Sequence, residues 1–284
     1  MLILAEPKID CHCHIVDPVG FPYAEGVKYR PTGQEIGPLD QFEAVCATYG
    51  VAHALIVGPN SGYGSDNRCL LDALRRSGAR FKGIAVVDND ASPGMLADLK
   101  ANGVVGIAIN ATYHGVDHYL GIGPLIDRMC ELGLMLQIQV EGDQLVRLMP
   151  LVERTDIPVL IDHCGRPILE SGLSQPGFRA LCELGRSGRA VIKLSGLQKF
   201  SRQRYPYDDT RPFVKALVEA FGLERCIWGS DWPYLRAEER LDYGPLLTLV
   251  ARHFPDEAQR RMLLWETPRR LFGFGDDSDG QPVR

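Results

Sequence analysis

Short apolar runs alternate along the chain with longer amphipathic stretches. Most of the short runs are nearly continuous in apolar residues, which is typical of strands buried on both faces. Because helix-like stretches separate these runs, the pattern predicts a parallel sheet covered by helices. The eight expected strands are residues 8–14, 53–58, 81–88, 104–110, 134–141, 159–165, 190–196 and 226–232.

Several of the intervening stretches carry signals of a helix end. The stretch 39–50 closes on a glycine, as a helix C-terminus often does. Ser92 stands before a proline, which fits a helix cap followed by the first helical position. We expect one or two closing helices in residues 256–273 and a loose polar tail in residues 275–284.

Eight strand–helix repeats in about 270 residues fit an α/β fold of the closed (β/α)₈ type, a TIM barrel, as one domain. We therefore predict a single domain over residues 1–274, with the closing helices at its C-terminal end. A doubly wound open sheet is the alternative. The first strand, however, lacks the GxGxxG turn into a helix that is typical of many such sheets.

The composition limits the partners of the protein. The chain has 284 residues, of which 45% are hydrophobic and 24% charged, and a formal net charge of −5. These values are ordinary for a globular protein and favour neither nucleic acid nor a membrane as a partner. The N-terminal segment is too short and too soon charged for a signal peptide. Eight scattered cysteines without a CxxC motif predict reduced thiols and a cytoplasmic location.

Polar and reactive side chains follow the ends of the predicted strands. In a barrel of this type the active residues lie at the C-terminal strand ends, where the loops to the helices begin. The side chains found there are His12, His14, Asn60, Ser61, Asn110, Tyr113, His114, Gln139, Glu141, Asp162, His163, Arg166, Lys193, Ser195, Ser230, Asp231 and Trp232.

The first strand ends in the sequence CHCH. His12 and His14 are two residues apart, so both imidazoles can point into the barrel mouth. By the same alternation, Cys11 and Cys13 are expected to face the helix layer, and cysteine and histidine would not share one metal ion. Two core histidines with satisfied hydrogen bonds and no chemistry are the alternative.

His163 and Asp231 end the sixth and eighth predicted strands. A carboxylate after a largely apolar strand is costly to bury without partners, and imidazoles could be those partners. Near the two histidines of the first strand, Asp231 could take a proton from water as a general base. Alternatively, its carboxylate only ties strand eight to strand one.

Four segments resemble, in the same order, those of the 2-pyrone-4,6-dicarboxylate lactonase group of the amidohydrolase superfamily. They read DCHCHIVDPVGFPYAEGVKYRPTG, GIAVVD, VLIDHCGRP and IWGSDWPY. The resemblance implies a (β/α)₈ barrel that hydrolyses a cyclic ester, with Asp231 deprotonating water. It also implies that His12, His14 and His163 polarise the carbonyl or carry protons.

The resemblance further implies a set of substrate contacts. Tyr29 and Ser61 would lie near the substrate, and Arg166 could pair with a carboxylate. Position at a strand end adds three further candidates, which are Asn110, Tyr113 and Gln139. The segment 23–33 is expected to cover the barrel mouth.

The chain departs from this group in strand four. Ala108 stands where the group has an arginine, and His114 and His118 follow where another arginine would be expected. We therefore predict a carboxylated lactone related to, but not identical with, 2-pyrone-4,6-dicarboxylate. Activity on that pyrone is expected to be poor, because even one lost arginine–carboxylate contact removes about 1.5–3 kcal/mol.

The lactonase group looks metal-independent, so no cofactor is expected to be required. Many other amidohydrolases are metal-dependent hydrolases, and His12, His14 and Asp231 could hold one Zn or Mn ion here. A metal-dependent decarboxylase and a sugar-lactone isomerase on the same barrel stay as alternatives, as does a binding module without catalysis. The sequence predicts a small-molecule lactone as the partner and does not predict an oligomeric state.

Overall fold

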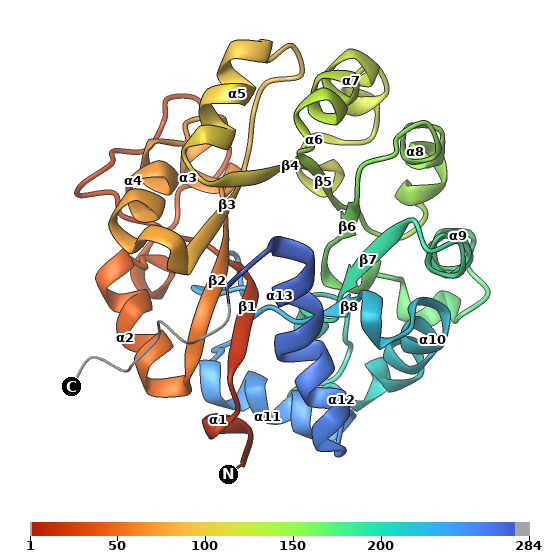
Figure 1. The fold of residues 1–284 in the computed structure, drawn as a ribbon. Helices are drawn as coiled ribbons and strands as arrows, with labels where there is room; N and C mark the ends of the chain where they lie inside the picture. Colours follow the sequence, from red (N-terminus) through yellow and green to blue (C-terminus); the bar gives the residue numbers. More distant parts are fainter. Residues whose placement is uncertain (1, 276–284) are drawn as a thin grey trace.

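The computed structural model describes residues 2–275, so all but the first residue of the predicted tail 275–284 lies outside the described part. Eight parallel strands form one sheet in the order β1 to β8 (Figure 1). The strands are β1 Lys8–Cys13, β2 Val51–Val57, β3 Phe81–Ala85, β4 Val104–Asn110, β5 Met135–Gln139, β6 Val159–Ile161, β7 Ala190–Lys193 and β8 Cys226–Ile227.

Helices surround this sheet, and the predicted cap residues lie at the ends of two of them. The helices are α1 Leu2–Ala5, α2 Leu39–Tyr49, α3 Asn60–Tyr63, α4 Arg68–Ser77, α5 Pro93–Ala101, α6 Ala111–His114, α7 Gly123–Leu132, α8 Gln144–Glu153, α9 Pro176–Arg186, α10 Arg211–Phe221, α11 Tyr243–His253, α12 Glu257–Arg261 and α13 Thr267–Phe272. The Ser92 hydroxyl accepts a hydrogen bond from the Met95 amide (3.2 Å) at the start of α5. Gly50 ends α2 with φ +68°, a conformation that favours glycine.

The first and last strands meet and complete the barrel, which excludes the open doubly wound sheet. The Cys11 amide donates to the Trp228 carbonyl (2.9 Å), and the Asp231 amide donates to the His12 carbonyl (2.7 Å). We call this contact between β1 and the segment 226–232 the seam of the barrel. The buried carboxylate of Asp10 belongs to it, because it accepts hydrogen bonds from the Ser230 amide (2.9 Å) and the Tyr243 hydroxyl (2.9 Å). The side chain that ties strand eight to strand one is therefore Asp10.

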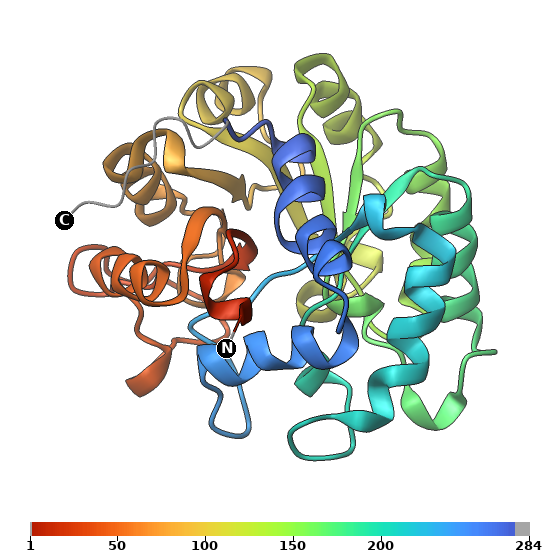
Figure 2. The same cartoon turned by 60° about the horizontal axis from the view of Figure 1, so that its bottom comes forward.

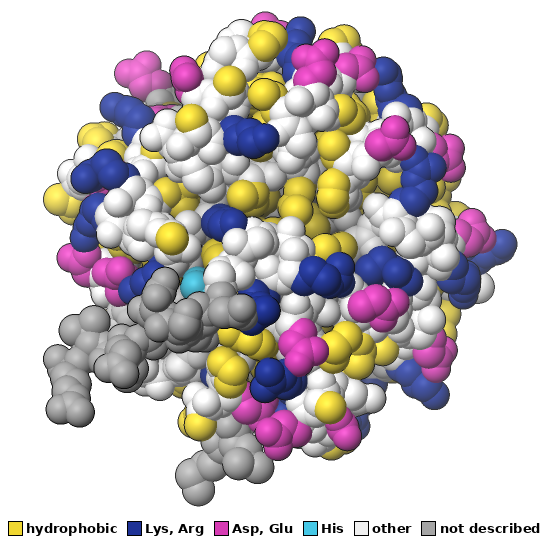
Figure 3. Space-filling view, in the orientation of Figure 1, with side chains coloured by type: hydrophobic (Ala, Val, Ile, Leu, Met, Phe, Trp, Pro, Cys, Tyr) yellow, Lys and Arg dark blue, Asp and Glu magenta, His cyan; other side chains and the backbone are white. Residues whose placement is uncertain are grey.

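The closing helices cover one end of the barrel. A π-helical turn, Met262–Glu266, joins α12 to α13, and α13 lies across the barrel in both views (Figures 1 and 2). Trp265 and Phe272 pack with Ile9 and Leu55 of the barrel interior. On the face of the molecule that carries these helices, acidic and basic side chains are interspersed (Figure 3). The functional residues lie at the opposite end, where the strands finish.

Seven of the eight strands end earlier than predicted, and the difference is largest for the sixth and the eighth. β6 ends before His163 and β8 ends before Asp231, and both residues have a left-handed backbone, with φ of +51° and +63°. A strand cannot continue through such a residue, so neither strand could reach its predicted end; β6 stops at Ile161 and β8 at Ile227. Non-glycine residues in this conformation are uncommon and gather at functional sites.

The expectation that both cysteines of CHCH face the helices is wrong for Cys11. Cys13 packs in the cluster between strands and helices that contains Phe42, whereas Cys11 packs with Ile9 in the barrel interior. The pairing of β1 with β2 shifts register between Asp10 and Cys13, and this irregularity breaks the strict alternation of faces. No described helix is long and apolar enough to cross a bilayer.

Candidate active site

A cavity of about 710 Å³ opens at the C-terminal ends of the strands. Its wall is formed by side chains from loops that are far apart in the sequence, as the barrel fold predicts. The predicted site residues that line it are His12, His14, Ser61, Asn110, Tyr113, Gln139, His163, Arg166 and Asp231. Ala108, the departure in strand four, also lines it, so that its small side chain faces the ligand space.

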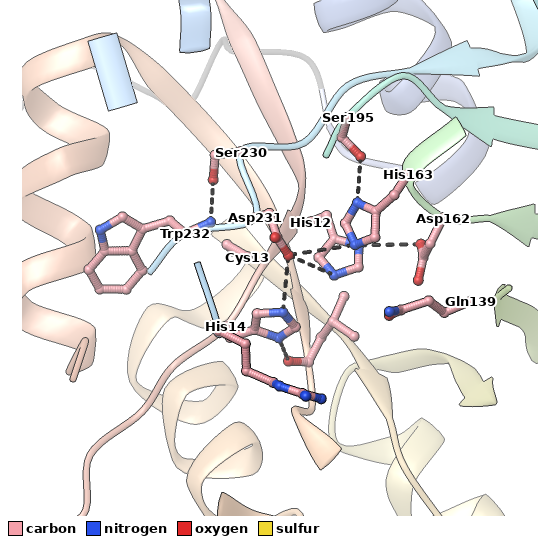
Figure 4. Close-up of polar contacts among 12 residues, drawn as sticks. His12, Cys13, His14, Gln139, Asp162, His163, Ser195, Ser230, Asp231 and Trp232 are labelled. Atoms are coloured by element: carbon pink, nitrogen blue, oxygen red, sulfur yellow. Dashed lines mark hydrogen bonds and ion pairs between the residues drawn. The ribbon is translucent and has the colours of Figure 1, made fainter. Parts of the chain in front are cut away.

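One carboxylate oxygen lies at the centre of three imidazoles (Figure 4). Asp231 Oδ1 is 3.6 Å from Nε2 of His12, 3.5 Å from Nε2 of His14 and 3.6 Å from Nε2 of His163. All four side chains are buried. These distances exceed an ordinary hydrogen bond, so Oδ1 is close to all three rings without being strongly bound to any of them.

The opposite nitrogens of two of these rings are held by fixed partners. His14 Nδ1 lies 2.7 Å from the Val57 carbonyl oxygen, and His163 Nδ1 lies 3.0 Å from the Ser195 hydroxyl. These contacts orient the Nε2 atoms towards the cavity (Figure 4). The histidines are therefore positioned by the strands and loops around them before any ligand enters.

A buried polar network lies beneath His12. The Lys193 ammonium donates to Gln137 Oε1 (2.6 Å) and lies 3.1 Å from His12 Nδ1 and 3.1 Å from Asp162 Oδ1. The Gln137 amide donates in turn to Asp162 Oδ2 (2.9 Å). Burying charged groups is tolerated only where they are paired in this way.

A second lysine touches the central carboxylate. Lys199 Nζ is 2.8 Å from Asp231 Oδ2, and its side chain is partly exposed in the cavity wall. Burial alone would raise the pKa of Asp231, but the charge of Lys199 outweighs it and holds this pKa well below its usual range. Asp231 is therefore ionised at neutral pH.

The environment keeps two of the imidazoles neutral. Burial and the nearby Lys193 ammonium lower the pKa of His12 to about 4, although Asp162 acts in the opposite direction. Burial also lowers the pKa of His163 well below its usual value. Burial would raise the pKa of Asp162, but the Lys193 ammonium outweighs it and keeps that carboxylate ionised. The site thus combines carboxylates with uncharged imidazoles, the combination needed for proton transfer.

A family model described as amidohydrolase matches residues 9–274 of this chain. The chain belongs to the amidohydrolase family. The 4-sulfomuconolactone hydrolase of Rhizobium radiobacter is 36% identical over 278 residues, covering 93% of this chain and 89% of the relative. The 2-pyrone-4,6-dicarboxylate hydrolase of Comamonas testosteroni is 27% identical over 277 residues, with coverage of 93% and 89%.

A solved structure gives the same answer for the fold. The structure of a candidate 2-pyrone-4,6-dicarboxylic acid hydrolase from Pseudomonas putida matches this amidohydrolase with a TM-score of 0.81 and 27% identity. The match covers 94% of this chain and 98% of that one. The predictions of a (β/α)₈ barrel and of an enzyme of the amidohydrolase superfamily are confirmed, and the binding module without catalysis is set aside.

The predicted substrate contacts of this amidohydrolase differ in how they are held. Asn110 and Gln139 lie side by side, with the Asn110 amide 3.4 Å from Gln139 Oε1. Tyr113 accepts a hydrogen bond from the Lys28 amide through its hydroxyl (3.1 Å), so the segment 23–33 contacts the cavity wall. Arg166 pairs with Glu141 (3.1 Å).

Tyr29 is the predicted contact that does not line the cavity. Its hydroxyl donates to Glu35 (2.6 Å), and the Arg236 guanidinium lies over its ring at 5.6 Å. Burial and the hydrogen bond to Glu35 raise the pKa of Tyr29 to about 12. The structure thus turns this hydroxyl towards its own loop.

Sequence reasoning left four polar residues of the site without a role. Lys193 and Asp162 were predicted only as polar side chains at strand ends, and Gln137 is an inward position of a strand that is otherwise largely apolar. The alternation of side chains along a strand was a signal for Lys193 and Gln137. A polar side chain that points inward from a buried strand, a lysine above all, needs a buried partner. Lys199 lies on a loop whose geometry no sequence pattern fixes.

The amidohydrolase site has the donors that a divalent ion would need. His12, His14 and Asp231 each place one ligand atom within 4.8 Å of the others, as do His12, Asp162 and His163. Two imidazoles and a carboxylate are suitable ligands for zinc. By the type and spacing of their ligand atoms, therefore, His12, His14 and Asp231 fit the single Zn or Mn ion that the sequence analysis kept as an alternative.

Proposed function

We propose that this amidohydrolase hydrolyses a lactone that carries anionic groups. The observation that carries the proposal is the position of Asp231 Oδ1, within 3.6 Å of three imidazole Nε2 atoms at the base of the cavity. The relative named 4-sulfomuconolactone hydrolase, 36% identical, supports a lactone as the substrate class.

Asp231 acts as the general base. It is ionised, and its Oδ1 is close to, but not tied to, the imidazoles, so it can accept a proton from a water molecule in the cavity. The resulting hydroxide forms a bond to the lactone carbonyl carbon. When the ring C–O bond breaks, the departing oxygen takes the proton from Asp231, and the ring opens to a hydroxy acid or its keto tautomer.

The imidazoles stabilise the charge that develops on the carbonyl oxygen. Because burial keeps His12 and His163 neutral, an Nε2–H group can donate a hydrogen bond there without first gaining a proton. Removing a single donor of this kind typically costs about 10²–10³ in kcat. His14 Nε2 faces Asp231 Oδ1 in the same cavity (3.5 Å).

Basic side chains around the cavity support an anionic substrate. Arg166, Lys199, Arg202 and Arg204 all line it. Ala108 offers no charge at the wall position where the pyrone dicarboxylate group is expected to carry an arginine. The absence of one bidentate contact, worth about 1.5–3 kcal/mol, lowers kcat/KM on 2-pyrone-4,6-dicarboxylate by about 10- to 150-fold.

A lactone panel in ¹⁸O-labelled water tests the proposal. We expect 4-sulfomuconolactone or another anionic lactone to be opened with one ¹⁸O atom in the new carboxylate, at a higher kcat/KM than the pyrone dicarboxylate. Asp231→Asn should abolish turnover without unfolding the protein. Asp127→Asn, the same change on the exposed surface of α7, is the matched control and should behave as wild type.

Other products would overturn the assignment. A rearranged lactone without ¹⁸O would indicate the sugar-lactone isomerase, and released carbon dioxide would indicate the decarboxylase. Turnover that survives in Asp231→Asn would show that another group is the base.

We also propose that catalysis requires no metal ion. Lys199 already places a positive charge on the second oxygen of Asp231, and Asn110 and Gln139 bind each other through neutral amides. If an ion were bound by His12, His14 and Asp231, it would polarise the carbonyl or acidify water. The steps above use only the side chains of the protein.

The cytoplasmic location stays a prediction. The eight cysteines are free thiols, and seven of them are buried, which supports a reducing compartment.

A further inference from the structure

The buried ammonium of Lys193 lies directly behind His12 and faces three acceptor atoms. They are Gln137 Oε1, His12 Nδ1 and Asp162 Oδ1, at 2.6, 3.1 and 3.1 Å. An ammonium group has three hydrogens to donate and no lone pair. We propose that Lys193 is a positioning residue that fixes the ring proton of His12 on Nε2, which makes His12 the hydrogen-bond donor of the site.

The competing partner of His12 Nδ1 is Asp162. If that carboxylate accepted a proton from Nδ1, the ring would carry its proton on the other nitrogen. Asp162 Oδ1 is 3.3 Å from Nδ1, but this ion-pair contact does not meet the geometry of a hydrogen bond. Lys193 meets the geometry of a hydrogen bond to the same nitrogen. The contacts therefore favour Nδ1 as an acceptor.

Gln137 strengthens this arrangement. Its amide nitrogen donates to Asp162 Oδ2 (2.9 Å), so its oxygen is turned to Lys193. The lysine is thus held by a hydrogen bond to a fixed amide oxygen and by an ion pair with a carboxylate, and its third contact is with the imidazole. All of these side chains are buried, so water does not compete for the contacts.

His14 shows the opposite arrangement. Its Nδ1 lies 2.7 Å from the Val57 carbonyl, which can only accept, so Nδ1 carries a proton; in the neutral ring, Nε2 then presents a lone pair. The two histidines of the HxH pair therefore meet Asp231 in opposite tautomers. Given the proposed lactone hydrolysis, His12 donates to the carbonyl oxygen, while His14 and Asp231 accept the hydrogens of the attacking water.

The same contact acts against a metal ion. A ligand histidine must offer a lone pair on the atom that faces the ion, and a protonated Nε2 of His12 has none. To coordinate through Nε2, the ring would have to move its proton to Nδ1, where it would meet the Lys193 ammonium. Lys193 thereby disfavours the ion that the donor set would otherwise fit.

Nitrogen NMR of the substrate-free protein, with ¹⁵N-labelled histidine, tests the tautomers directly. We expect His12, identified by the signals missing in His12→Gln, to show a protonated Nε2 and an unprotonated Nδ1. In Lys193→Met the pattern should reverse, and the affinity for zinc, measured by competition with a chelator, should rise at least tenfold. Lys8→Met, another buried lysine but at the far end of β1, is the matched control and should change neither.

The variant Lys193→Met leaves the Asp162 charge unpaired and could lose its fold, so Lys193→Met with Asp162→Asn serves as a second variant. A wild-type protein with Nδ1–H on His12 would overturn the proposal, as would a variant that folds and keeps Nε2–H. Equal zinc affinity in wild type and variant would overturn it as well. None of these measurements uses a lactone. The proposed tautomer of His12 can therefore be refuted while lactone hydrolysis stands, and lactone hydrolysis can be refuted while the tautomer stands.

Discussion

Gly229, in the chain between β8 and Asp231, packs directly against the main chain of His12. A Cβ atom at this position would lie 2.5 Å from His12 Cβ, 2.6 Å from its amide nitrogen and 3.0 Å from its Cα. Since ordinary contact begins near 3.4 Å, Gly229→Ala requires a separation of about 0.9 Å between the two segments. None of the three atoms is the end of a flexible side chain, so a change of rotamer cannot relieve the clash.

The displacement caused by Gly229→Ala changes the distance between Asp231 and His12, on which catalysis depends. Asp231 follows two residues after Gly229, and its amide is bonded to the His12 carbonyl at 2.7 Å. A misplacement of about 1 Å can reduce a rate about 100-fold, and overpacking a filled site costs about 1–3 kcal/mol of stability. We therefore expect Gly229→Ala to lower kcat by about two orders of magnitude and Tm by several degrees.

Steady-state hydrolysis of the best lactone, together with calorimetry, measures both effects. Gly121→Ala is the matched control, since no atom lies within 4 Å of the added Cβ and the backbone is not left-handed there. It should retain the kcat and Tm of the wild type. If Gly229→Ala is as active and as stable as Gly121→Ala, the seam does not set the geometry of the site.

Four further predictions concern charge, stability and metal. Because Asp231 is ionised and His12 is neutral above its pKa of about 4, kcat/KM should be level from about pH 5 to pH 8 and fall only in more acidic buffer. Lys199→Met removes the cation that lowers the pKa of Asp231, so the acid limb of that profile should move to higher pH; an unmoved limb would contradict the role given to this ion pair. Tyr243→Phe removes a hydrogen bond to the buried carboxylate of Asp10 and should cost about 1.5–3 kcal/mol in urea unfolding, whereas an unchanged midpoint would show that the contact contributes nothing. Dialysis against a chelator should leave turnover intact, and loss with rescue by Zn or Mn would refute the metal-independent mechanism.

The sequence carried most of the information about the fold. The expected strand 104–110 has the same bounds as β4, and the apolar runs and helix ends place the other elements within a few residues. The rule that functional residues follow parallel strands brought His12, His14 and Asp231 to one cavity. These features depend on local periodicity, which a single chain displays directly.

Other features depend on how distant segments pack, and local patterns do not record them. Cys11 turns inward because of a register shift that exists only once β1 pairs with β2. β6 ends early at Ile161, and the left-handed backbone of His163 follows two residues later. The contacts of Tyr29 with Glu35 and of Lys199 with Asp231 arise from loops that close over the barrel.

The seam between β1 and β8 has a consequence for the order of synthesis. His12 is synthesised 219 residues before Asp231, yet the two are joined by a backbone hydrogen bond. A nascent chain that has not yet released β8 from the ribosome contains the imidazoles without their carboxylate. The newly made enzyme is therefore inactive until the ring of strands has closed. A gene divided between β7 and β8 would give two inactive fragments, and their reassembly would be detected as restored turnover.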